Sequence, residues 1–158
     1  MSLTTVLVLA FAIGLIAGLR SMTAPAVTSL AAHWHWFSLQ NSGLAFMGSA
    51  VAAYIFAAAA LGELVVDKLP QAPSRKELLG LIARIVLGGL SAAVLCAAVN
   101  QSAGLGAALG GVGGIAGAYA GYEARMRLVK ALKVPDFVIA LLEDAVAIGG
   151  GFFIVSRF

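Results

Sequence analysis

Five ionisable residues lie inside otherwise apolar stretches of this 158-residue chain: Arg20, Glu63, Arg84, Glu143 and Asp144. An ionisable side chain near the centre of a membrane helix costs at least about 2.5–3.5 kcal/mol, so it marks a functional site by default. Carboxylates gathered at low dielectric attract a cation or retain a proton. The chemistry that these residue types suggest is the binding of a proton or a small cation inside a membrane.

Spacing brings three of these charges to one depth. Glu63, Arg84 and Glu143 each lie about seven residues, or about 10 Å at the helical rise, from the polar end of their apolar stretch. Asp67 lies four residues after Glu63 and shares its helical face. Asp144 follows Glu143 directly and lies about 100° around the helix from it, so at most one of these two carboxylates points into a shared cavity. We expect Glu63 and Glu143 to bind the ion. Asp67 and Asp144 assist, and Arg84 acts as a movable counter-charge. Alternatively, Arg84 pairs with a carboxylate only to hold helices in register.

Arg20 opens a segment, 21–41, that is too polar for a simple membrane span. Pro25 lacks a backbone donor and disfavours a continuous helix, so we expect a broken or re-entrant element over 21–37. Arg20, with the hydroxyls of Ser21 and Thr23, would there contact an anionic group. The alternative is an interfacial loop with a snorkelling Arg20.

Composition limits the class of protein. Only 11% of residues are charged, 61% are hydrophobic, and the mean hydropathy is +1.01, whereas about a quarter of a soluble domain is charged. A soluble enzyme and a disordered chain are excluded, and the single Cys96 excludes an intrachain disulfide scaffold. His33 and His35 have no neighbouring cysteine or carboxylate, which disfavours a metal site there. We expect no cofactor and no enzymatic activity, because no hydrolytic motif is present.

The elements that must position the charges are membrane helices. A spanning helix needs about 20 mostly apolar residues, and the sequence predicts an all-α integral membrane protein with one domain, 1–158. About five spans are expected, at 3–19, 42–66, 78–99, 104–122 and 137–155.

Loop charge predicts the orientation. Seven of the ten basic residues fall between the second and third spans or between the fourth and fifth: Lys68, Arg75, Lys76, Arg125, Arg127, Lys130 and Lys133. The positive-inside rule makes both loops cytoplasmic, and five spans then put the N-terminus in the cytoplasm. The basic residues are not interleaved with aromatic ones, so a nucleic-acid partner is excluded.

Two rows of glycine mark the fourth span: Gly106, Gly110 and Gly114, then Gly113, Gly117 and Gly121. Small residues at a spacing of four allow close helix packing, so this span is central to the fold or to an oligomer, and we favour a homodimer. Short matches between 16–18 and 115–117, and between 60–63 and 140–143, suggest an inverted repeat.

Three motifs carry a resemblance to a known family: Gly18-Leu19-Arg20-Ser21, the Glu-x-x-x-Asp-Lys-x-Pro element at 63–70, and Leu142-Glu143-Asp144-Ala145. Over almost the whole chain, the sequence resembles the bacterial membrane family called domain of unknown function 4126. Its His-Gly-x-Lys stretch is replaced here by residues 121–124, Gly-Tyr-Glu-Ala. The resemblance implies a multi-pass protein of the bacterial inner (plasma) membrane and brings no assigned activity.

The function expected from these features is transport. We expect a small transporter or channel that moves a cation, proton or small ion through a polar cavity lined by the intramembrane carboxylates. The alternative is a non-transporting scaffold or assembly partner that associates through the glycine-rich fourth helix. A lipid-modifying enzyme that uses Arg20 on a head group is a third reading, but no motif supports it.

Overall fold

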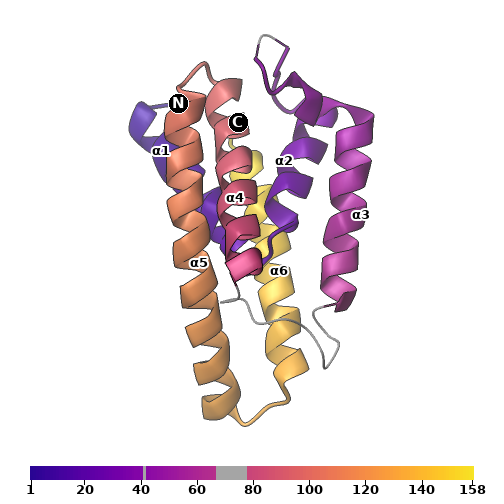
Figure 1. Cartoon of the computed structure of the whole chain (residues 1–158), viewed down its shortest axis with the longest axis vertical. Helices are drawn as coiled ribbons and strands as arrows, with labels where there is room; N and C mark the ends of the chain where they lie inside the picture. Colours follow the sequence, from indigo (N-terminus) through magenta and orange to yellow (C-terminus); the bar gives the residue numbers. More distant parts are fainter. Residues whose placement is uncertain (41, 67–77) are drawn as a thin grey trace.

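The computed structural model describes residues 1–40, 42–66 and 78–158, and these residues form helices and connecting turns without a strand (Figure 1). The helices are α1 (Leu3–Leu19), α2 (Thr23–His33), the short 3₁₀ helix η1 (Ala45–Gly48), α3 (Ala50–Val66), α4 (Leu78–Ala98), α5 (Ala103–Leu132) and α6 (Asp136–Val155). The predicted all-α class is confirmed.

Three of these helices, α4, α5 and α6, are long and apolar enough to cross a membrane, and α1 and α3 are shorter apolar helices of 17 residues. This pattern indicates a multi-pass membrane protein. It does not establish the expected count of five spans, because α1 and α3 fall short of the usual length.

Two predicted boundaries differ from the observed helices. The second span was expected to begin at residue 42, but α3 begins at Ala50, where the Ser49 hydroxyl accepts from the Ala52 amide at 3.1 Å. The fourth span was expected to end at 122, but α5 continues to Leu132. The charges after 122 mark the end of the apolar stretch. They do not end the helix, because charged residues in water do not oppose helix formation.

The predicted interruption after the first span is present, but Pro25 is not its cause. α1 ends at Leu19 and α2 begins at Thr23, so Pro25 occupies the first turn of α2, where no backbone donor is needed. Nine of the eleven α2 residues are buried. We call residues 20–22 the α1–α2 break.

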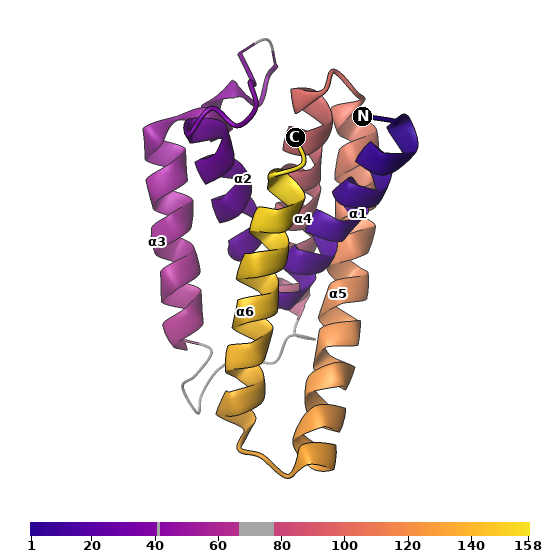
Figure 2. The same ribbon diagram turned by 180° about the vertical axis from the view of Figure 1, so that it is seen from behind.

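Successive helices run in alternating directions, and both termini lie at the end of the bundle opposite the α5–α6 turn (Figures 1 and 2). As a result, α1 and α5 run the same way: Gly14 packs on Gly110, and Gly18 packs on Gly114 and Gly117. An inverted repeat would need these two helices to be antiparallel. The expected inverted repeat is therefore not supported for α1 and α5. The reason is that α2 is an additional helix in the chain, so every helix after it runs opposite to the expected direction.

The two glycine rows of α5 face two different helices of the same chain. A β-carbon at Gly106, Gly110 or Gly114 would lie 2.2–2.7 Å from a backbone oxygen of α4. A β-carbon at Gly113 or Gly117 would lie 2.3–2.4 Å from a backbone oxygen of α1, and the last glycine of this row is buried as well. These contacts make α1, α4 and α5 a closely packed unit in which glycine is required for helix approach.

Candidate functional site

The α1–α2 break gathers charged side chains from three other helices. Glu63 reaches it from α3, Arg84 from α4 and Asp144 from α6, while Arg20 lies in the break itself. A helix break leaves carbonyl groups without partners at one side and amide groups at the other. The charged residues fit this arrangement, because the carboxylate of Glu63 meets amides and the guanidinium of Arg84 meets a carbonyl.

Glu63 caps the N-terminus of α2. Its carboxylate accepts from the Ser21 amide at 2.8 Å, the Ser21 hydroxyl at 2.5 Å and the Met22 amide at 2.9 Å. Met22, the N-cap residue, makes no side-chain capping bond of its own. A carboxylate at this position satisfies orphan donors and complements the positive end of the helix dipole. A residue from α3 thus replaces the Ser or Asp that usually caps a helix from within.

Arg84 acts at the other side of the break. Its Nε donates to the Gly18 carbonyl at 3.1 Å, at the C-terminal end of α1, and its Nη1 donates to the Gly80 carbonyl at 3.0 Å. The residue is only 7% exposed. A guanidinium at a helix C-terminus complements the negative end of the dipole. These bonds tie Arg84 to α1 and to its own helix.

Arg20 and Asp144 form a buried ion pair that joins the break to α6. Arg20 is fully buried, and Asp144 is 7% exposed. Removing two charges from water costs several kcal/mol per ion, and their attraction offsets that cost only in good geometry. The anionic group expected to meet Arg20 is therefore, in this structure, a carboxylate of the same chain.

Glu143 points to a different partner. Its carboxylate lies 3.7 Å from Arg125 on α5, and Arg125 also binds Asp136 through two bonds of 2.8 and 2.5 Å. Glu143 and Asp144 are adjacent in sequence but lie on different faces of α6. It is Asp144, expected only to assist, that reaches the break.

The structure brings together most of the residues that the sequence singled out. Arg20, Ser21, Glu63, Arg84 and Asp144 meet at the break. Thr23 is buried in the first turn of α2, Glu143 lies apart, and Asp67 falls outside the described residues.

The described residues at the break are balanced in charge. The site contains two carboxylates, Glu63 and Asp144, and two guanidinium groups, Arg20 and Arg84. From the sequence, Arg20 was expected to contact an anionic group at the broken segment and was not assigned to these carboxylates. The signal that could have paired it with Asp144 is its position directly after an apolar helix, where an unpaired charge is costly.

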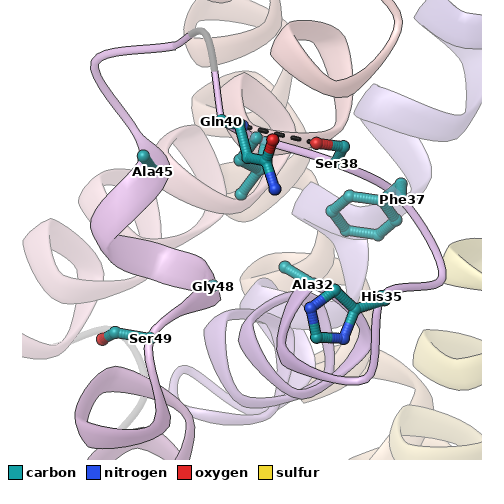
Figure 3. Close-up of a pocket in the computed structure, with 9 residues that line it drawn as sticks. Ala32, His35, Phe37, Ser38, Gln40, Ala45, Gly48 and Ser49 are labelled. Carbon is teal, nitrogen blue, oxygen red and sulfur yellow. Dashed lines mark hydrogen bonds between the residues drawn. The ribbon is translucent and has the colours of Figure 1, made fainter.

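A separate pocket lies at the opposite end of α2 (Figure 3). Its volume is about 240 Å³, and no described Asp, Glu, Lys or Arg lines it. The lining residues are Ala32, His35, Phe37, Ser38, Leu39, Gln40, Ala45, Gly48 and Ser49. Among the described residues, no group of three His, Cys, Asp or Glu side chains could hold a metal ion. The ring of His33 lies edge-on to the ring of Tyr54, with 5.9 Å between the two ring centroids.

Comparison with known protein families gives a match. The family model described as Domain of unknown function (DUF4126) matches residues 7–156. No curated protein and no solved structure matches the chain. The family match covers nearly the whole chain, includes all three motifs named above, and confirms the resemblance. The chain therefore belongs to this family of unknown function.

Proposed function

We propose that the protein is a small membrane transporter or channel for a proton or small cation, and that ion exchange occurs at the α1–α2 break. The observation that carries this proposal is the buried Arg20–Asp144 pair at a helix break, within a bundle of apolar helices. A well-packed apolar pair would hold the same helices at no greater cost, so retaining two charges favours a functional role. Broken helices with charged groups at their ends are typical of transporter binding sites.

The geometry supports a specific division of roles. Asp144 is the proton- or cation-binding group, and Arg20 is the counter-charge that the incoming ion displaces. Arg84 suits the role of movable counter-charge less well, because two backbone carbonyls hold its guanidinium. Glu63 fixes the N-terminus of α2 and so keeps the break in position.

The directions of the helices favour an orientation opposite to the expected one. The α5–α6 turn and the basic end of α5 lie opposite both termini (Figure 2). The positive-inside rule makes this basic end cytoplasmic in the bacterial plasma membrane. The N-terminus and the C-terminus would then both face the outside, so we revise the expectation of a cytoplasmic N-terminus, which depended on an odd number of crossings.

The alternative function is a scaffold that associates through the glycine-rich fourth helix, and we favour it less. Both glycine rows of α5 are in contact with α1 and α4 of the same chain. A homodimer would need a face other than these two glycine rows.

Proteoliposome flux tests the transport proposal. Protons are followed with an internal pH-sensitive dye under a potassium diffusion potential, and sodium and potassium are followed in parallel. We expect Asp144→Asn to abolish the flux that the wild type shows. Asp136→Asn, the same change on the same helix but at an exposed ion pair, should leave the flux unchanged.

A second variant separates transport from folding. Arg20→Met/Asp144→Leu removes both charges and replaces them with apolar side chains, which restores packing without a titratable group. We expect it to fold and to carry no flux. Flux at the wild-type level in this folded double variant would disprove the proposal, as would the absence of flux of all three ions in the wild type.

A further inference from the structure

The end of α5 extends beyond any apolar span. The helix has 30 residues, or about 45 Å, against about 30 Å for the hydrocarbon core of a bilayer. Figure 2 shows α5 and α6 extending past the end of α3. The last part of α5 therefore lies where lipid headgroups are expected, at the end opposite the pocket and both termini.

Basic residues on this extension fall into two groups. Arg125 is held by Asp136 and lies near Glu143, so it fastens α5 to α6 and has little freedom to bind anything else. In contrast, Arg127, Lys130 and Lys133 are all exposed. The side chain of Arg127 is 82% exposed, and its acidic neighbour is Glu123, 3.6 Å away and also largely exposed. Such a solvent-exposed pair contributes little binding energy, so Arg127 can exchange partners readily.

The three exposed cations lie along the last two turns of α5 and at its cap. Positions 127 and 130 are about 60° apart around the helix, and Lys133 is the residue that caps its C-terminus. Met126 lies about 40° from Lys130 around the helix and is 56% exposed, and Phe137, in the first turn of α6, is also 56% exposed. Exposed apolar and cationic side chains at one level suit the boundary between lipid headgroups and acyl chains, where both kinds of group are satisfied.

We propose that Arg127, Lys130 and Lys133 form a binding surface for the headgroups of anionic phospholipids. The apolar residues beside them select a membrane lipid over free phosphate, because only a lipid supplies acyl chains to cover them. This inference depends on the multi-pass membrane arrangement and is independent of transport. It assigns a role to the part of α5 that the α1–α2 break does not use.

Lipid binding by the purified full-length protein tests the surface. The protein in a neutral detergent is mixed with equal amounts of phosphatidylglycerol and phosphatidylcholine, and native mass spectrometry counts the lipids retained. We expect the wild type to prefer phosphatidylglycerol. The preference should fall about fivefold for each charge removed, since a basic residue near an anionic surface contributes about that factor at low salt. Arg127→Gln/Lys130→Gln/Lys133→Gln should abolish it.

Controls distinguish this surface from basic charge in general. Arg127→Lys/Lys130→Arg/Lys133→Arg should keep the preference. Arg157→Gln, at the opposite end of the bundle, should leave it unchanged, whereas the single change Lys130→Gln should reduce it. Addition of millimolar inorganic phosphate should not compete. The proposal is overturned if the triple Gln variant retains the wild-type preference, if the wild type has none, or if inorganic phosphate displaces the lipid.

Discussion

Replacing Gly110 with alanine should separate α4 from α5 at their closest approach. A β-carbon at Gly110 would lie 2.2 Å from the Gly88 oxygen, whereas ordinary contacts begin at 3.4 Å, so the backbones must move apart by about 1 Å. The obstructing atom belongs to the backbone of a packed helix, so no side-chain rotation can make room. Overpacking of this kind costs about 1–3 kcal/mol.

Gly149→Ala is the matched control. Gly149 is also a helical glycine, on α6, and a β-carbon there meets nothing within 4 Å. Both variants gain the same helix propensity, up to about 1 kcal/mol for Gly→Ala. The difference between their free energies of unfolding therefore isolates the steric cost at Gly110.

The protein contains its own reporter for this measurement. Cys96 is the single cysteine and is fully buried on α4, so a thiol-reactive fluorogenic dye labels it only when the bundle opens. Thermal unfolding in detergent should place Gly110→Ala below the wild type and Gly149→Ala at or above it. Equal midpoints for the two variants would refute the inferred packing of α4 on α5.

Three further predictions concern the charged residues. Asp144→Asn should lower the free energy of unfolding by about 3–5 kcal/mol, because it removes the carboxylate charge that faces the buried guanidinium of Arg20, and the same dye assay measures it. A loss below 1 kcal/mol would mean that the pair is solvated. Glu63→Ala should destabilise the protein by about 1–3 kcal/mol through the lost cap of α2, with Glu63→Gln intermediate. Amide hydrogen exchange should then increase first at residues 21–25, and unchanged protection there would contradict the capping role. Asp136→Asn should cost about 1 kcal/mol or less, since that carboxylate is 62% exposed, and a larger shift in the unfolding midpoint would show that its ion pair with Arg125 is more buried than the structure indicates.

Much of the helix pattern could be predicted from apolar runs alone. The first span was predicted at 3–19 and α1 has those bounds, and the start at 78 agrees with α4. The hydrophobic effect and the bilayer thickness determine such runs locally, without knowledge of the fold. The end of α5 was missed, because it depends on water beyond the membrane. The segment that contains α2 was expected only as a broken or re-entrant element over 21–37, because its helical form depends on burial by other helices.

The candidate site could be predicted only as a set of residue types. Glu63, Arg84 and Asp144 were singled out because charge in an apolar helix is costly. Their partners were not predictable. Glu143 and Asp144 are adjacent in sequence but lie on two sides of α6. Which of these sides meets the break depends on how α6 is rotated about its axis in the bundle. Spacing along one helix gives relative angles and contains no information about that rotation.

The sequence by itself therefore determined the environment of this protein: apolar helices, a membrane, scarce and costly charges, and membership of one family. Only the tertiary structure decided which charges meet. Arg20 pairs with Asp144, and Glu63 caps a helix that the sequence left ambiguous. The physical reason is that burial and the hydrophobic effect act on each stretch separately, whereas ion pairs and caps need atoms from distant segments within a few ångströms.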